Sequence, residues 1–180
     1  YRHEWRLRKN TIREQILNEV GAPCFVKAAN LGSSVGITKV KSEDKLEEAI
    51  DTACEFSHRI IVEKAIKNPR EIEVSVLGND DPIASVPGEI IPHREFYDYI
   101  AKYIEEGTSL IVPANLDKEM VEKLQEYSVR AFKSLDCAGM GRVDFLMEKE
   151  TGEIFVSEIN TIPGFTQISM YPKLWEVSGM

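Results

Sequence analysis

The chain has 180 residues, of which 30 are acidic and 22 basic, giving a formal net charge of −8 at pH 7. This length is enough for one sizeable core or two small lobes. The negative charge argues against a nucleic-acid backbone as a partner. No apolar run reaches membrane-spanning length, and the basic opening YRHEWRLRKN lacks the apolar stretch of a secretory signal. Neither a membrane nor a nucleic acid is therefore expected as a partner.

The three cysteines are Cys24, Cys54 and Cys137, an odd number without the spacing of a metal site. Each lies in an apolar context, so we expect buried free thiols. Free thiols are typical of a reducing compartment, which favours a cytoplasmic location.

Two helices and three strands are predicted in the first third of the chain. They are a helix at 11–20 that ends at Gly21, strands at 24–27 and 37–40, a helix capped by Ser42, and a strand at 59–65. Apolar residues at helical spacing indicate the helices, and short β-like runs indicate the strands.

The remainder of the chain predicts an antiparallel arrangement. A strand at 71–77 and short strands at 83–86 and 89–91 precede the stretch 92–107, which has no clear period and is rich in aromatic and charged side chains. A loop that long is uncommon unless it is functional. Asp117 then caps a long amphipathic helix.

The last predicted elements are two strands, 141–147 and about 153–159, joined by a turn at 150–152. Side chains repeat every two residues along a strand, so Glu158 and Asn160 share a face. If the strands pair as a hairpin, Asp144 converges with Glu158 and Asn160, and Arg142 lies beside them.

Two carboxylates so close repel each other unless something positive lies between them. The three candidate ligands, Asp144, Glu158 and Asn160, are hard oxygen donors, which suits Mg²⁺ or Mn²⁺ and argues against zinc or copper. Mg²⁺ is usually completed by substrate phosphates, so the patch predicts a phosphate-bearing partner. The alternative is an ordinary exposed acidic hairpin.

Other segments could handle a nucleotide. The Gly-Ser loop 32–36 lacks the ending of a Walker P-loop, but its backbone N–H groups and the hydroxyls of Ser33 and Ser34 could wrap phosphate oxygens. Lys27 ends a buried strand, where a lysine is costly unless it meets an anion. The alternative for this loop is a simple turn.

Three further residues have weaker support from the sequence alone. Lys102 lies in the aromatic stretch, with a solvated surface lysine as the alternative. Glu63 and Glu71 could accept hydrogen bonds from a nucleotide's amino group and ribose hydroxyls. The alternative for both is an exposed acid at the end of a strand.

Strand-end Lys27, the GSSVG loop, Glu63 and the Asp…Glu-x-Asn hairpin, in this order, resemble the ATP-grasp superfamily. Within that superfamily, four stretches look like D-alanine–D-alanine ligases. They are VKAANLGSSVGI at 26–37, FYDYIAKY at 96–103, GMGRVDF at 139–145 and EINTIPGFTQISMYP at 158–172. The resemblance implies an α+β ATP-grasp fold of two lobes with largely antiparallel sheets enclosing the nucleotide.

The resemblance also implies roles for individual residues. Asp144, Glu158 and Asn160 would hold two Mg²⁺ (or Mn²⁺) ions. The residues that would bind ATP are Lys27, Ser33, Ser34, Glu63, Lys64, Ile66, Glu71 and Lys102. Arg142 and the Gly164 amide would stabilise an oxyanion, Ser169 would receive a substrate carboxylate, and Tyr103 with Ser33 would orient a substrate.

By this resemblance, residues 1–66 form part of the central ATP-grasp lobe and 67–180 the C-terminal lobe, without its closing C-terminal helix. The family's N-terminal domain, which binds the first D-alanine, is expected to lie outside the chain. Ala28 stands where the family commonly has proline.

The implied activity is ATP-dependent joining of two D-alanines for peptidoglycan synthesis, and the resemblance suggests a homodimer. Three alternatives remain open: a ligase that joins D-alanine to D-lactate or D-serine, another ATP-grasp carboxylate–amine ligase, and a nucleotide-binding module without catalysis.

Overall fold

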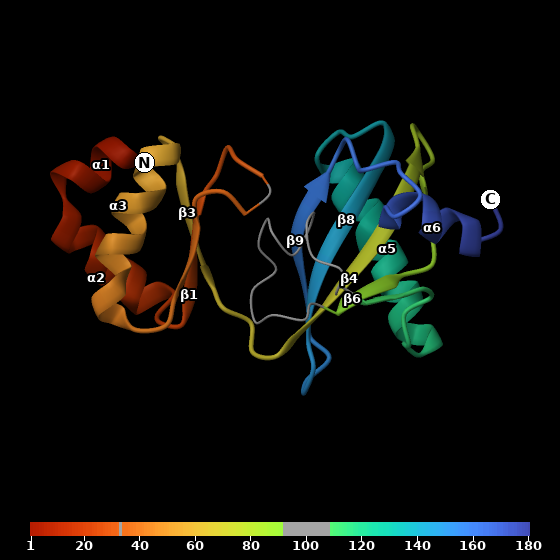
Figure 1. The fold of residues 1–180 in the computed structure, drawn as a ribbon, viewed down its shortest axis with the longest axis horizontal. Helices are drawn as coiled ribbons and strands as arrows, with labels where there is room; N and C mark the ends of the chain where they lie inside the picture. The colour runs from red at the N-terminus through yellow and green to blue at the C-terminus, as the bar shows by residue number, and fades with distance from the viewer. Residues whose placement is uncertain (33, 92–108) are drawn as a thin grey trace. The chain divides into compact units, whose positions relative to one another are not determined.

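The computed structural model of the chain describes residues 1–32, 34–91 and 109–180. These residues form two compact units, the first being Tyr1–Ala65 and the second the described residues from Ile66 onward. Each unit has its own sheet, helices and apolar core (Figure 1). All strand pairs among the described residues are antiparallel, as predicted.

The first unit is a three-stranded sheet of order β2-β1-β3 whose helices cover one face. Its elements are α1 (Arg2–Leu7), α2 (Lys9–Glu19), β1 (Cys24–Ala28), β2 (Ile37–Val40), the 3₁₀ helix η1 (Glu43–Lys45), α3 (Leu46–Phe56) and β3 (Ile60–Lys64). The predicted helices and strands of this region are confirmed, whereas α1 was not predicted from the sequence.

Alternation along β1 decides which face of this sheet is covered. Cys24, Val26 and Ala28 are buried, while the residues between them are partly exposed. Cys24 and Val26 pack against the apolar side of α3, and Trp5 of α1 joins the same core. The Trp5 indole Nε1 also donates to Asp51 Oδ1 of α3 at 2.7 Å, which ties α1 to α3.

The predicted cap at Ser42 is wrong in detail. The Ser42 hydroxyl donates to Asp44 Oδ1 at 2.5 Å and makes no hydrogen bond to the helix backbone. Because η1 occupies residues 43–45, the α-helix begins only at Leu46. A serine at this position commonly accepts a hydrogen bond from a backbone N–H of the helix. Here the Ser42 hydroxyl bonds the Asp44 side chain, two residues away, instead.

The second unit is built on a sheet of order β7-β6-β4-β8-β9, with β5 added beside β4. Its elements are β4 (Pro69–Gly78), β5 (Ile83–Ala84), β6 (Gly88–Ile91), β7 (Ser109–Ile111), α5 (Lys118–Ser134), β8 (Gly139–Glu148), β9 (Ile154–Asn160) and α6 (Met170–Val177). The predicted strands and the long helix are confirmed. The Asp117 side chain accepts from the Met120 backbone N–H at 2.8 Å, so the predicted cap is confirmed as well.

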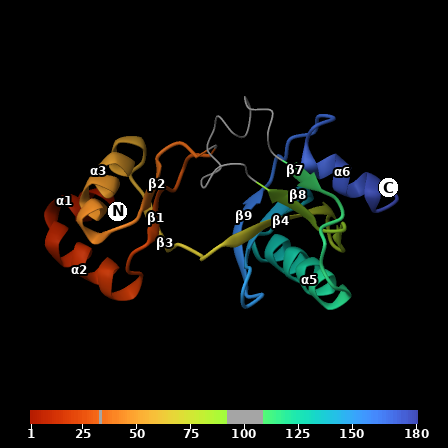
Figure 2. The same ribbon diagram turned by 60° about the horizontal axis from the view of Figure 1, so that its bottom comes forward.

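One face of this sheet is apolar and packs against α5, which lies beside the sheet in Figure 2. The buried residues of this core are Ile72, Val74, Val76, Ala114, Leu124, Phe132, Val143, Phe145 and Met147. Since neighbouring side chains along a strand point to opposite faces, the residues between them on β4 and β8 face the other way. The apolar face thereby fixes which polar side chains are presented together on the opposite face.

Helix α6 covers part of that opposite face, over β4 and β6. The Ser75 hydroxyl donates to the Tyr171 carbonyl oxygen at 3.2 Å, and the Tyr171 hydroxyl donates to the Val76 carbonyl oxygen at 3.0 Å. A Cβ at Gly88 would lie 2.8 Å from Leu174 Cδ2, so glycine permits the close approach of α6 to β6. The sequence predicted neither α6 nor β7.

The cysteines are all free: Cys24 and Cys54 are buried, as expected, but Cys137 is only partly buried. Burial raises the pKa of the Cys24 and Cys54 thiols. Among the helices in the described parts of the chain, none is both long enough and apolar enough to cross a membrane.

We expect Leu124→Ala to lower the free energy of unfolding by about 2–5 kcal/mol, because the fully buried side chain leaves a cavity between α5 and the sheet. Leu135→Ala, at the end of the same helix where the leucine is 65% exposed, is the matched control and should change stability far less. Denaturant unfolding of both variants measures the difference. Equal losses would mean that α5 does not pack as described.

Candidate functional site

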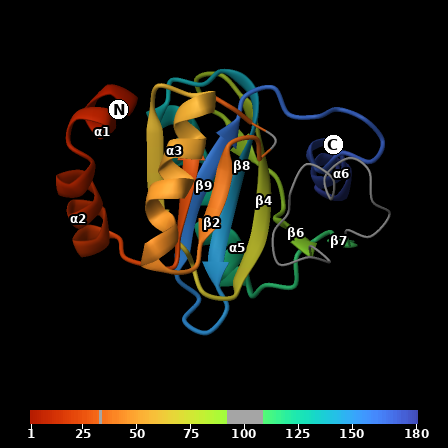
Figure 3. The same cartoon turned by 60° about the vertical axis from the view of Figure 1, so that its left-hand side comes forward.

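The predicted hairpin is confirmed, since β8 and β9 pair in antiparallel fashion. Asp144 lies directly opposite Glu158, and Arg142 lies directly opposite Asn160. Strands β4, β8 and β9 run side by side in Figure 3. The hairpin thus brings together the three predicted metal ligands and the predicted oxyanion residue.

A β-bulge in β9 makes this convergence possible. Ile154 and Ile159 both pack against the core under α5, although an interval of five residues would place them on opposite faces of a regular strand. The register shift opposite Asp144 and Phe145 leaves Ser157 as the extra residue. Past the bulge, Ile159 faces the core and Glu158 faces the same way as Asp144.

The Asp144 carboxylate is the most heavily bonded group of the patch. Arg142 Nε donates to Asp144 Oδ1 and Arg142 Nη2 donates to Oδ2, both at 2.7 Å. Asn160 Nδ2 donates to Asp144 Oδ2 at 2.9 Å and lies 3.5 Å from Glu158 Oε1. The positive partner that two neighbouring carboxylates require is therefore supplied by the guanidinium, with an amide N–H between the acids.

Sequence reasoning missed one charged member of the patch, Glu73 of β4. This residue is directly opposite Asp144 in the β4–β8 register and is 6% exposed. Arg142 Nε lies 3.0 Å from Glu73 Oε2. The alternating sequence of β4 could have indicated that Glu73 shares a face with Glu71 and Ser75, but the pairing of β4 with β8 joins segments about 70 residues apart and is not readable locally.

Arg142 remains charged in this setting. Burial by itself would lower the pKa of Arg142, but the hydrogen bonds and charge of Asp144, followed by the charges of Glu73 and Glu158, raise the pKa above its ordinary value. The guanidinium is therefore a fixed positive charge among three carboxylates. Such a charge is suited to bind an anionic group or to stabilise developing negative charge.

The donor set of the patch fits a hard divalent cation. In the described part of the chain, no three His, Cys, Asp or Glu side chains are grouped as a metal site, so a cation here would rely on Asp144, Glu158 and the Asn160 amide. Mg²⁺ characteristically takes one or two carboxylates and leaves other positions to water or phosphate. Both oxygens of Asp144 accept from Arg142, so a cation held here would share that carboxylate with the guanidinium.

The segment after β9 holds two further predicted residues. A Cβ at Gly164 would lie 2.9 Å from the Ser169 hydroxyl oxygen, so the two residues are close neighbours. The Ser169 hydroxyl accepts from the Thr166 backbone N–H at 3.1 Å and lies 2.9 Å from the Thr166 hydroxyl. Both Gly164 and Ser169 therefore belong to one compact loop that leads from β9 into α6.

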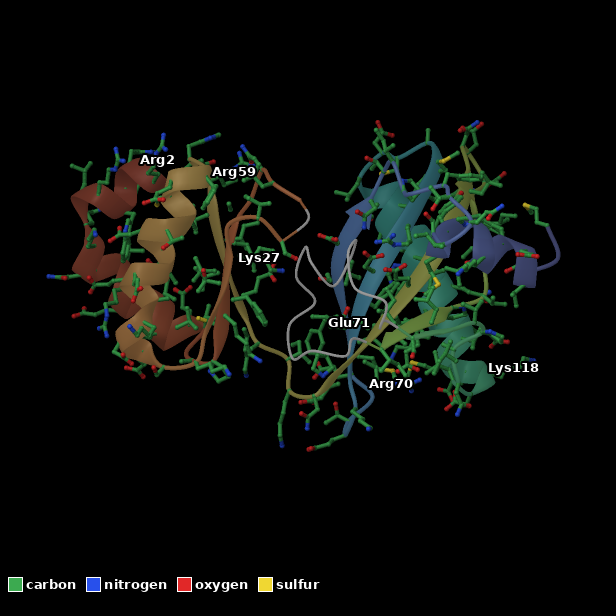
Figure 4. The ribbon with its side chains drawn as sticks, in the orientation of Figure 1. Arg2, Lys27, Arg59, Arg70, Glu71 and Lys118 are labelled. Carbon is green, nitrogen blue, oxygen red and sulfur yellow. The ribbon has the colours of Figure 1, made fainter. Side chains whose placement is uncertain are left out.

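In the first unit, Lys27 of β1 and Glu63 of β3 form an ion pair with an N–O distance of 2.5 Å. The lysine projects from the side of the sheet away from the helices (Figure 4). Its side chain is 24% exposed, so Lys27 is partly buried, while the residues on the other face of β1 are fully buried. The anion beside Lys27 in this structure is the carboxylate of Glu63.

The Gly-Ser loop connects β1 with β2, and its described residues form tight turns. Ala28 N–H donates to the Gly36 carbonyl at 3.0 Å, and Val35 N–H donates to the Gly32 carbonyl at 3.1 Å. Ser34 has a φ of 62°, a left-handed conformation that is uncommon for serine. Such a conformation is found in loops whose backbone N–H groups bind anions. The binding of phosphate by this loop stays a prediction.

The remaining predicted residues are of two kinds. Ser33, Lys102, Tyr103 and the stretch 92–107 lie outside the described residues. Lys64 ends β3 and is exposed, and Ile66 follows in the segment that leads to β4. Glu71 of β4, labelled in Figure 4, is partly buried, in line with Glu73 along the same strand.

A family model described as "D-ala D-ala ligase C-terminus" matches residues 1–180, the whole chain. The chain belongs to this family. A D-alanine–D-alanine ligase of Clostridium novyi is 53% identical over 177 residues, which are 98% of this chain and 51% of the relative. A ligase of the same name from Ruminiclostridium cellulolyticum is 56% identical over 168 residues. The chain thus spans about half the length of the curated relatives that it matches.

Solved structures of ligases share the fold of this family member. The D-alanine–D-alanine ligase of Coxiella burnetii matches with a TM-score of 0.80 and 40% identity, over 94% of this chain and 44% of that chain. The VanG D-Ala:D-Ser ligase of Enterococcus faecalis matches with a TM-score of 0.85 and 37% identity, over 97% and 50%. The expected α+β ATP-grasp fold with antiparallel sheets is confirmed.

Deletion of Ser157 tests the role of the bulge. Without the extra residue, β9 must either turn Glu158 toward the core under α5 or withdraw Ile154 from it. We expect the free energy of unfolding to fall by more than about 3 kcal/mol, because a carboxylate in an apolar core is costly. Ser157→Ala keeps the chain length and is the control, with little expected change. Thermal or denaturant unfolding that is the same for both variants would show that the bulge is dispensable.

Proposed function

We propose that this chain is the ATP-grasp part of an ATP-dependent D-alanine–D-alanine ligase that supplies the dipeptide for peptidoglycan synthesis. The observation that carries the proposal is the convergence of Asp144, Glu158, Asn160 and Arg142 on one partly exposed sheet face. The membership of the chain in the D-ala D-ala ligase C-terminus family supports it.

The proposed reaction has two steps. A carboxylate oxygen of the first D-alanine attacks the γ-phosphorus of ATP, giving an acyl phosphate and ADP. The amine of the second D-alanine then attacks the acyl carbon, the amine loses a proton, and inorganic phosphate leaves with the electrons of the broken C–O bond. Both steps move negative charge between oxygens, so positioning and charge neutralisation account for most of the catalysis.

In this proposal, Asp144, Glu158 and Asn160 hold the divalent cations, Mg²⁺ or Mn²⁺, whose chemistry is to neutralise the phosphate oxygens. The patch offers two carboxylates and one amide, the few hard donors that suit this cation. Arg142 is the fixed positive charge beside them, placed to stabilise the oxyanion of the tetrahedral intermediate. The Gly164 amide takes the same role.

A further set of residues is proposed to bind ATP. Lys27 would exchange its present partner, Glu63, for ATP phosphates, and Glu63 would then accept from the nucleotide. The other residues proposed for this role are Ser33, Ser34, Lys64, Ile66, Glu71 and Lys102. The left-handed backbone at Ser34 supports a loop whose N–H groups point toward phosphate oxygens.

Substrate positioning is proposed for Ser169, which would receive the carboxylate of the second amino acid, and for Tyr103 with Ser33. The Ser169 hydroxyl already accepts a hydrogen bond from the backbone at Thr166, which fixes its direction within the loop. Water must be kept from the acyl phosphate, and a long loop such as 92–107 is proposed to provide that protection.

The larger assembly is likewise a proposal. Residues 1–66 are assigned to the central ATP-grasp lobe and 67–180 to the C-terminal lobe, with the domain for the first D-alanine supplied by chain beyond these residues. The relatives are about twice as long as this chain, which supports a further domain in the complete protein. A homodimer and a cytoplasmic location are proposed from the family resemblance.

A second candidate is a ligase that joins D-alanine to D-serine. It is favoured by one observation, the TM-score of 0.85 to the VanG D-Ala:D-Ser ligase. The residue that would separate the two activities is Tyr103, which lies outside the described residues. Substrate competition between D-alanine and D-serine as the second amino acid decides between the candidates.

Phosphate release from ATP by the complete polypeptide tests the proposal. With Mg²⁺, release should require D-alanine and should not be supported by L-alanine, and D-alanyl-D-alanine should accumulate in equal amount. Tight ATP binding without acceptor-dependent release would instead indicate a nucleotide-binding module. Release driven by a different carboxylate and amine would indicate another ATP-grasp ligase.

Asp144→Asn and Glu158→Gln are expected to lower kcat by at least about a hundredfold, because each removes a carboxylate charge that would hold the cation, and the cation offsets the charge of the phosphate oxygens. Glu148→Gln is the matched control. Glu148 is the last residue of β8, and its carboxylate accepts a hydrogen bond from the Thr151 hydroxyl instead of contacting the patch. Its activity should stay near that of the wild type, and all three variants should keep their secondary structure. Near-normal activity of Asp144→Asn at saturating Mg²⁺ would show that the metal assignment is wrong.

A further inference from the structure

Glu73 of β4 is an acidic residue in the interior of a sheet, and the proposed reaction gives it no task. It is 6% exposed and lies in the centre of the sheet, between β6 and β8. Burial of a carboxylate costs free energy unless the charge is compensated. Ser75, the next residue on the same face, is fully buried and uncharged, so this face does not itself demand an acid.

The strand register places Glu73 in a row of carboxylates. Glu73 is opposite Asp144, and Asp144 is opposite Glu158, so three acids lie across three neighbouring strands. Arg142 lies one row further on the same face of β8. Its Nε is 2.7 Å from Asp144 Oδ1 and 3.0 Å from Glu73 Oε2, so one guanidinium serves two carboxylates.

The two carboxylates differ in what they must do during the proposed reaction. Asp144 holds Arg142 with both of its oxygens, and those oxygens are also the ones that a cation would take. A cation held by these oxygens would draw on the same lone pairs and charge, and would weaken the hydrogen bonds that Asp144 accepts from Arg142. Glu73, on the other side of the guanidinium and outside the proposed ligand set, keeps its charge contact.

We infer that Glu73 is a positioning residue, which holds the Arg142 guanidinium in place when the oxygens of Asp144 bind a divalent cation. This inference rests on the proposed function, because it needs Asp144 as a metal ligand. Glu73 contacts neither substrate nor cation in this scheme and acts through Arg142. Its loss should therefore reduce the rate of the chemical step more than the binding of ATP.

The chain provides a closely matched control in Glu89 of β6. Glu89 is 8% exposed and forms a two-fold hydrogen bond with Arg70, whose Nε and Nη2 lie 2.8 and 2.7 Å from its oxygens. Arg70 is labelled in Figure 4. In the register Glu89 is opposite Ile72, a core residue, so this pair lies on the other face of the sheet from Arg142. Glu73 and Glu89 therefore share burial and partner type but not the site.

The experiment compares Glu73→Gln, Glu89→Gln and the wild type in the complete polypeptide. Glu73→Gln should lower kcat about tenfold with KM for ATP changed by less than about twofold, since one preorganised charge is loosened rather than removed. Glu89→Gln should keep kcat within about twofold. Thermal unfolding of both variants reports the stability cost of each lost ion pair, which should be similar.

A second readout does not depend on turnover. The Nε–H resonance of Arg142, assigned with an Arg142→Lys variant, is followed in ¹H–¹⁵N spectra as Mg²⁺ and a non-hydrolysable ATP analogue are added. In the wild type and in Glu89→Gln it should stay resolved at saturation. In Glu73→Gln it should broaden or exchange with solvent about tenfold faster.

Two outcomes would overturn the inference: an Arg142 resonance in Glu73→Gln that matches the wild type at saturation, or equal losses of kcat in the Glu73 and Glu89 variants. The second result would mean that Glu73 only stabilises the fold. A wild-type protein without D-alanine-dependent phosphate release would refute the proposed function instead. The resonance would still show whether Glu73 holds Arg142.

Discussion

Like charges on neighbouring strands are the constraint around which the second unit is built. Asp144 and Glu158 face each other across β8 and β9, where two carboxylates are unfavourable unless a positive group joins them. Arg142 and the Asn160 amide meet that need. The sheet tolerates these charges because the opposite face of the same strands packs under α5, and this apolar burial stabilises the sheet independently of the charges.

Local patterns in the sequence predicted most of the elements and part of the site. Alternation and a glycine turn predicted the hairpin, and the aspartate before an amphipathic run predicted the cap at Asp117, since both depend on residues close in sequence. The position of Glu73 beside Arg142 depends on the pairing of β4 with β8, and α6 on contacts with β4 and β6. Those pairings are set by tertiary packing, which local periodicity does not report.

The first unit shows a different limit. The sequence identified Lys27 as a lysine that needs an anion, and the structure supplies one from Glu63. The lysine is only partly buried, because a three-stranded sheet with helices on one side fully buries only alternate residues of its central strand. Ser33, Lys102 and Tyr103 lie outside the described residues, so their roles stay predictions that rest on family resemblance.

The bulge at Ser157 separates two requirements that otherwise conflict within β9. On one side of it the strand follows the pattern of the core, and on the other side it follows the pattern of the site. The two parts of β9 are separated by the presence of one extra residue, whatever its type. Scanning mutagenesis at constant length would consequently miss it, and alignments of distant homologues should tolerate many residues at this position but no gap.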